Sequence, residues 1–88
     1  MTIPLRRLLV PSGVYDPRYR AVIDRLRIVR QSKGLSQRAL ANLLDRRQQF
    51  VSKYEAGERK LDVVEVFDIA GALEIDPAEI FRDANLIE

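Results

Sequence analysis

The side chains of this sequence that could do chemistry are cations and amides around one short segment, residues 48–56. Gln48, Gln49 and Lys53 lie within the segment. The cations that flank it are Arg46, Arg47, Arg59 and Lys60. Guanidinium and ammonium groups bind phosphate oxygens, while side-chain amides pair with the edges of bases. Surface cations can also serve only to keep a protein in solution, but five of them around one segment favour contact with a polyanion.

The residue types that most often carry out catalysis are missing from the chain. Its 88 residues include no His and no Cys, which removes the commonest general base, the thiolate nucleophile and the usual ligands of zinc. The tight acid groupings are Asp62 with Glu65 and Asp76 with Glu79. Capping at the start of a helix explains both of them. We therefore expect no enzymatic activity, no bound metal and no cofactor.

Charge is unevenly distributed along the chain, although the net charge is only +2. Residues 1–60 hold 14 Lys and Arg against 5 acids, a charge of +9, whereas residues 61–88 hold one Arg against 8 acids, a charge of −7. Such a protein can present a positive face to a polyanion.

The apolar runs are too short to span a bilayer, and residues 1–16 do not resemble a secretory signal. We expect a cytoplasmic protein with no membrane partner.

Local start and stop signals divide the chain into an arm, five helices and a tail. Residues 1–16 are predicted to form the arm, because Pro and Gly interrupt its apolar run. Asp16-Pro17 is typical of a helix start, and Gly34 of a helix end. Caps at Ser36, Asp62 and Asp76 begin later helices. The predicted helices span residues 17–33, 37–44, 48–56, 63–73 and 77–81. The result is a compact all-α domain over residues 17–83, with a tail at 84–88.

Apolar residues recur at three- and four-residue steps in these helices, which defines an inner face for each. The predicted core consists of Leu26, Val29, Leu40, Leu44, Val51, Tyr54, Val66, Ile69 and Leu73. The segments 37–44 and 48–56 are short helices separated by about three residues. This pairing is typical of a helix-turn-helix, in which the first helix braces the second against a nucleic acid groove.

Four short motifs follow one another along the same part of the chain. They are Gly34-Leu35-Ser36-Gln37, Leu40-Ala41, Phe50-Val51-Ser52-Lys53-Tyr54-Glu55-Ala56-Gly57-Glu58-Arg59 and Ile69-Ala70-Gly71-Ala72-Leu73. In this order and spacing they resemble the lambda-repressor-like family (Cro/C1, or XRE), and the resemblance covers roughly residues 15–81. It implies a five-helix DNA-binding domain that reads the major groove with the third predicted helix.

The resemblance implies that bases are read from the first turns of the third helix. The matching positions are Arg47, Gln48, Gln49, Phe50, Ser52 and Lys53. Gln can pair with adenine, and Arg or Lys can pair with guanine. Phe50 has two interpretations that stay open at this point, contact with a thymine methyl group or packing in the core.

Phosphate contacts are expected on both sides of that helix. The resemblance implies that Gln37 binds a phosphate at the start of the second helix, where backbone amides and the helix dipole favour an anion. Arg46, Arg59 and Lys60 flank the third helix and are expected to hold phosphates without reading sequence.

One acid on the third helix is expected to be architectural. Glu55 would repel phosphate, and the resemblance pairs it with Arg30 in a charge-assisted bond.

The sequence departs from the family pattern at two positions of the turn. Asp45 stands where many relatives have Gly, and Arg47 stands where Ser, Thr or Pro is frequent. We therefore expect the third helix to lack its usual cap.

The predicted function is sequence-specific binding of double-stranded DNA by a regulator of transcription, a repressor. A single recognition helix offers few base contacts, so a homodimer on a two-fold symmetric operator is expected. The arm and the C-terminal end both remain open as the dimer contact, and Arg6 and Arg7 could instead enter the minor groove. The alternative function is an antitoxin or adaptor whose principal partner is another protein. Its candidate apolar contacts are Leu5, Leu8, Leu9, Leu43, Leu86 and Ile87.

Overall fold

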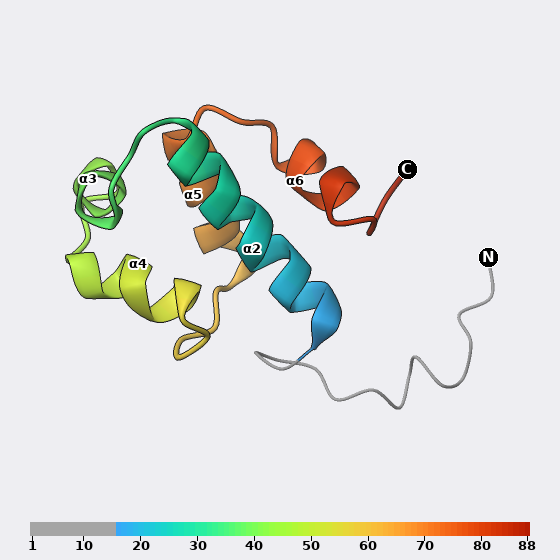
Figure 1. Ribbon diagram of the computed structural model, residues 1–88, viewed down its shortest axis with the longest axis horizontal. Helices are drawn as coiled ribbons and strands as arrows, with labels where there is room; N and C mark the ends of the chain where they lie inside the picture. Colours follow the sequence, from blue (N-terminus) through green and yellow to red (C-terminus); the bar gives the residue numbers. More distant parts are fainter. Residues whose placement is uncertain (1–15) are drawn as a thin grey trace.

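The computed structural model describes residues 16–88, and every regular element in that range is a helix (Figure 1). The helices are α2 (Pro17–Ser32), α3 (Gln37–Leu43), α4 (Gln48–Glu55), α5 (Val63–Ala72) and α6 (Pro77–Asp83). Their bounds lie within two residues of the predicted ones, which confirms the all-α, five-helix fold class. The predicted contacts of the arm, including those of Leu5, Arg6, Arg7, Leu8 and Leu9, lie outside the described residues.

Side-chain caps determine where most of the helices begin. Asp16, Ser36, Asp62 and Asp76 each accept a hydrogen bond from a backbone amide of the first turn. At α5 the capping box is complete, because the Glu65 side chain accepts in return from the Asp62 amide at 3.0 Å. At α6 only the Asp76 half of the predicted pair forms. The helix α4 begins after Arg47 without a side-chain cap, as its sequence predicts.

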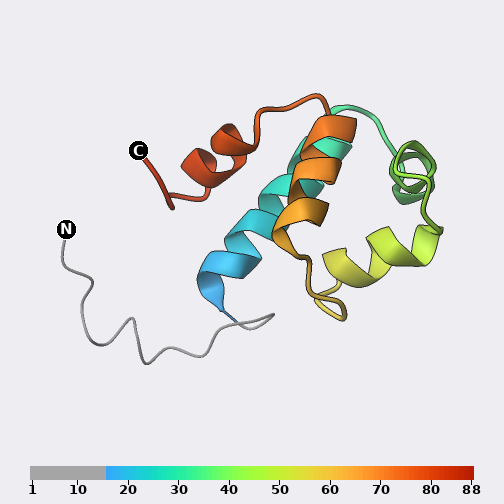
Figure 2. The ribbon, with the colours of Figure 1, turned by 180° about the vertical axis from the view of Figure 1, so that it is seen from behind.

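The helix α2 runs through the middle of the molecule, with α3 and α4 on one side of it and α6 on the other (Figure 1). The opposite view shows α5 in front of α2 (Figure 2). The helix α2 packs on α4 and α6, and α5 packs on α3 and α6. These contacts hold the pair α3–α4 on a rigid support, which a recognition unit requires.

Most of the predicted core is buried as expected, including Leu26, Leu40, Val51, Tyr54 and Ile69. Leu44 and Val66 are only partly buried at its edge. The helix α5 also leaves apolar side chains in solvent, since Val63, Val64 and Phe67 are 70%, 66% and 54% exposed. Leu43, Leu86 and Ile87, the described apolar candidates for a protein partner, are exposed as well.

The turn between α3 and α4 depends on one residue with left-handed backbone. Asp45 has φ +54°, a conformation that Asp tolerates better than most residues but less well than Gly. The turn is closed by the Arg46 amide, which donates to the Ala41 carbonyl at 2.9 Å. No helix formed by the described residues is long and apolar enough to cross a membrane.

Candidate nucleic-acid interface

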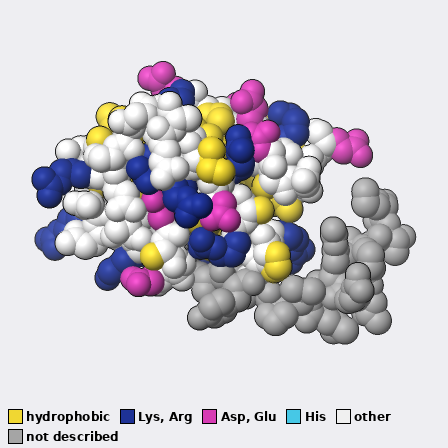
Figure 3. Space-filling view, viewed as in Figure 1, with side chains coloured by type: hydrophobic (Ala, Val, Ile, Leu, Met, Phe, Trp, Pro, Cys, Tyr) yellow, Lys and Arg dark blue, Asp and Glu magenta, His cyan; other side chains and the backbone are white. Residues whose placement is uncertain are grey.

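The helix α4 has one face in the core and one face in solvent. Val51 and Tyr54 are fully buried, and they fix the helix against α2 and the core. On the other face the predicted base-reading residues are exposed: Arg47, Gln48, Gln49 and Lys53. Ser52 is half-buried, and its hydroxyl donates to the Gln49 carbonyl at 3.3 Å. Figure 3 shows Lys and Arg side chains along the edge of the molecule that α3 and α4 form.

The first turn of α3 lies beside this exposed face. Gln37, the predicted phosphate ligand, is half-buried, and its amide donates to Glu55 Oε1 at 3.0 Å. The next residue, Arg38, is exposed, and its Nε lies 3.4 Å from Gln48 Oε1. The sequence analysis did not single out Arg38 for this surface. Its position directly after Gln37 at a helix N-terminus was the available signal, because the backbone amides and dipole of a helix N-terminus favour anions.

The charge-assisted bond expected between Arg30 and Glu55 is present, and it consists of two hydrogen bonds. Arg30 Nε donates to Glu55 Oε2 at 2.7 Å, and Nη2 donates to Oε1 at 3.0 Å. Arg30 Nη1 also donates to the Leu35 carbonyl at 2.7 Å. The two side chains are only 9% and 5% exposed. The pair therefore joins α2, the start of α3 and the end of α4 with charge-assisted bonds in a region of low dielectric.

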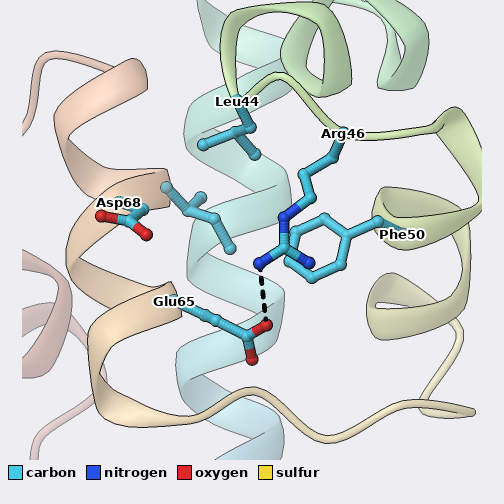
Figure 4. A pocket seen from close by; sticks show the side chains of 6 residues that line it. Leu44, Arg46, Phe50, Glu65 and Asp68 are labelled. Atoms are coloured by element: carbon cyan, nitrogen blue, oxygen red, sulfur yellow. Dashed lines mark hydrogen bonds and ion pairs between the residues drawn. The ribbon is translucent and has the colours of Figure 1, made fainter.

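A second ion-pair cluster joins the N-terminal half of α4 to α5. Glu65 accepts from Arg59 Nη1 at 3.0 Å and from Arg59 Nη2 at 2.8 Å, and Arg46 Nη2 lies 3.4 Å from Glu65 Oε2. Both guanidinium groups lie over the Phe50 ring, with Cζ 4.4 Å from the centroid for Arg46 and 4.8 Å for Arg59. Figure 4 shows Glu65 pointing from α5 toward the Arg46 group that covers the ring. We call these four residues the Glu65 cluster.

The Glu65 cluster holds one carboxylate between two guanidinium groups. The Arg59 guanidinium lowers the pKa of Glu65 through its hydrogen bonds, against the opposing effect of burial. The same bonds raise the pKa of Arg59. Glu65 is therefore ionised at neutral pH. The hollow beside the cluster has a volume of about 20 Å³, which is room for about one water molecule.

Phe50 is held by packing in this structure. Its ring is half-buried against the core and meets the Tyr54 ring edge to face, with centroids 5.5 Å apart. The remaining predicted phosphate ligand, Lys60, is exposed in the loop after α4. Arg46 and Arg59 thus lie at the Phe50 side of α4, whereas Gln37 contacts Glu55 and Arg38 contacts Gln48.

Comparisons with known proteins agree with this geometry. The helix-turn-helix family model HTH_3 matches residues 26–80. An XRE-family like protein from Pseudomonas syringae pv. tomato is 38% identical over 82% of this chain and 88% of its own, with a TM-score of 0.76. The restriction-modification controller protein C.AhdI from Aeromonas hydrophila is 36% identical over 75% of this chain and 98% of its own, with a TM-score of 0.66.

A third similar structure is the clp gene regulator ClgR from C. glutamicum. It is 25% identical over 78% of this chain and 87% of its own, with a TM-score of 0.69. A comparison with curated protein sequences gave no match. The matched family model and the likeness to these structures show that the chain belongs to the helix-turn-helix family HTH_3, the XRE-type DNA-binding proteins.

Proposed function

We propose that the chain is a sequence-specific regulator of transcription, a repressor, that reads the major groove of double-stranded DNA with α4. The observation that carries this proposal is the division of α4 into two faces. Its apolar face is locked in the core, while Gln48, Gln49 and Lys53 project into solvent. An α-helix fits the major groove, where every base pair presents a distinct pattern of donors and acceptors.

The side chains divide into readers and phosphate ligands by their chemistry. Gln48 and Gln49 can pair with adenine, and Arg47 and Lys53 can pair with guanine. Ser52, which is half-buried, adds a hydroxyl at the margin of the surface. The proposed phosphate ligands are Gln37, Arg38, Arg46, Arg59 and Lys60. They position the protein on the duplex and contribute to its affinity for every sequence.

Selection of bound sites from a pool of random DNA tests the proposal. We expect one enriched motif, and we expect Gln48→Ala and Lys53→Ala each to change the preference at one base by about 1–3 kcal/mol. Arg82→Ala removes a cation from α6, on the opposite side of α2 from α3 and α4 (Figure 1), and should leave both motif and affinity unchanged. Failure to enrich any motif, or an equal loss of affinity on every sequence in both reader variants, would contradict it.

We also propose that the regulator acts as a homodimer through the exposed apolar face of α5. One recognition helix makes too few base contacts for useful specificity, and a two-fold pair doubles them. Val63 and Phe67 are exposed and line an apolar groove of about 210 Å³ shared with α2 and α6. Exposed apolar side chains contiguous with a groove are typical of a protein-protein contact. In a two-fold symmetric dimer, each copy covers the apolar α5 face of the other.

Measurement of molar mass in solution tests the dimer. Val64→Asp places a charge on the exposed apolar face of α5, one turn from Phe67, and we expect it to shift the chain from dimer to monomer. Leu43→Asp makes the same change on α3, at a side chain of similar exposure (60% against 66%), and should leave the dimer intact. A wild-type chain that stays monomeric at every concentration would contradict the homodimer and favour a different protein as partner.

A further inference from the structure

We propose that Glu65 is a positioning residue for DNA binding, and that it acts by holding Arg46 and Arg59 ready for phosphate. The inference rests on the proposed function, because it concerns how the cations beside α4 meet the duplex. It assigns to an acid a favourable role in binding a polyanion, although the acid itself touches no phosphate.

The contacts of the Glu65 cluster restrain both arginines in one geometry. Arg59 is bound by both carboxylate oxygens, and its Nη1 also donates to the Lys60 carbonyl at 3.3 Å. Arg46 is held more weakly by the carboxylate, and the Phe50 ring supports its guanidinium group. Because Phe50 belongs to the first turn of α4, the two cations are fixed relative to the recognition helix itself.

The restrained cations still have donors and exposure to offer a ligand. A guanidinium group has five N–H donors. Within the described residues the Arg59 guanidinium group donates three hydrogen bonds and that of Arg46 donates one. Their side chains are 39% and 44% exposed, whereas that of Glu65 is only 9% exposed. The carboxylate is therefore screened from the duplex by the cations that it positions.

Two opposing effects predict opposite results when the charge of Glu65 is removed. Loss of a negative charge near DNA should strengthen binding, but the charge lies behind two cations and salt screens it, so this effect is below about twofold. Release of two long side chains means that both must be ordered again on binding, which weakens affinity by about fivefold to tenfold. The ordering effect is the larger one, so Glu65→Gln should weaken binding.

The first experiment measures the affinity of the full chain for a mixed-sequence DNA duplex, which suits phosphate contacts because they do not depend on sequence. We expect Glu65→Gln to bind about fivefold to tenfold more weakly than wild type. The matched control is Glu79→Gln, which makes the same charge change at the third position of α6, where the acid is exposed. It should bind as wild type does, or slightly more tightly.

A second background separates positioning from a purely structural role. Gln at position 65 keeps an oxygen for the Asp62 amide, so the start of α5 is retained. In the double variant Arg46→Gln/Arg59→Gln there are no cations left to position, and Glu65→Gln should then change affinity by less than about twofold. A structural role would instead weaken binding equally in both backgrounds, which would overturn the inference. Thermal unfolding of each variant gives the folded fraction for these affinities.

A third variant tests reach rather than charge. Glu65→Asp keeps the negative charge and the cap but shortens the side chain by one methylene, so it cannot hold both guanidinium groups. We expect it to weaken binding in the same direction as Glu65→Gln. If wild type binds the duplex and neither Glu65 variant is weaker, the inference is wrong. If wild type binds neither this duplex nor any selected sequence, the proposed function itself fails.

Discussion

At the scale of single residues, two buried acids tie the recognition helix to its surroundings. Glu55, the last residue of α4, receives bonds from Arg30 on α2 and from Gln37 at the start of α3. Glu65 on α5 reaches the other end of α4 through the guanidinium groups over Phe50. Glu55 neutralises Arg30, and Glu65 lies between two cations that would otherwise repel one another. The helix α4 is therefore held at both ends by bonds that pure apolar packing would not orient.

Removal of the Glu55 carboxylate should be strongly destabilising. Glu55→Ala leaves Arg30 as an uncompensated charge that is only 9% exposed, and we expect the free energy of unfolding to fall by about 3–5 kcal/mol. Urea-induced unfolding followed by circular dichroism measures it. Glu58→Ala, at an exposed acid three residues on, should change stability by less than about 0.5 kcal/mol. A loss at position 55 as small as at position 58 would show that the pair is not structural.

At the scale of the elements, α4 lacks the side-chain cap that the other four described helices have. Arg47 has the extended backbone of a capping residue, φ −71° and ψ 152°, but its side chain makes no capping bond. The first amides of α4 are therefore left to solvent or to a ligand. An arginine at this position contributes a cation to the exposed surface, while a Ser there would contribute stability. The choice is typical of a functional site, where local stability is lower than it could be.

Replacement of Arg47 should separate these two effects. Arg47→Ser supplies a hydroxyl to the free amides of α4, and we expect about 1 kcal/mol of added stability together with weaker DNA binding. Arg47→Ala removes the same cation but adds no cap, so it should weaken binding equally without the gain in stability. Thermal unfolding and a DNA titration of both variants check this. Equal stability of the two variants would mean that position 47 is not a usable cap.

At the scale of the whole molecule, the chain carries opposite charge in its two parts, yet the ion pairs cross between them. The Glu65 cluster links acids of the C-terminal part to cations beside α4, and Arg25 on α2 pairs with Asp83 on α6 at 3.2 Å. These contacts lower the self-repulsion of each part. The bonds of the Glu65 cluster also make stability depend on the ionisation of Glu65 at low pH.

Acid should unfold the protein as Asp16 and Glu65, two carboxylates with a lowered pKa, become protonated. The Arg18 side chain, by its hydrogen bond, lowers the pKa of Asp16 from its usual 3.8 to about 2, and Arg59 lowers that of Glu65. A folded-state pKa below the unfolded value stabilises the fold above the unfolded pKa, and this stabilisation is lost as the pH falls toward the folded pKa. For Asp16 the window runs from 3.8 down to about 2.

The melting temperature measured between these pH values checks the prediction. We expect Asp16→Asn to flatten its dependence on pH, because the titrating group is gone. Asp76→Asn is the matched control, since Asp76 is also a helix cap but belongs to the exposed start of α6. A wild-type melting temperature that stays constant across the window would contradict the assignment.

The helix bounds and most of the core depend on local signals, so the sequence alone was sufficient to predict them. Helix bounds depend on caps and turns within three or four residues, such as Ser36 before α3 and Gly34 after α2, and periodicity within each helix identified Leu26, Leu40 and Val51 as core. The exposure of Gln48, Gln49 and Lys53 on α4 follows from the same periodicity once the buried face of the helix is known. Local signals are short-range, so they do not depend on how the helices pack.

Only the tertiary structure decided the contacts between residues that are far apart in the chain. Glu65 was predicted as a cap, but its bond to Arg46 spans 19 residues and exists only because α5 packs behind the turn before α4. The same holds for Phe50, whose ring was left open between base contact and packing, and for Phe67, which periodicity cannot place inside or outside. Whether a side chain is covered depends on the neighbouring helix, and the position of that helix is a property of the whole fold.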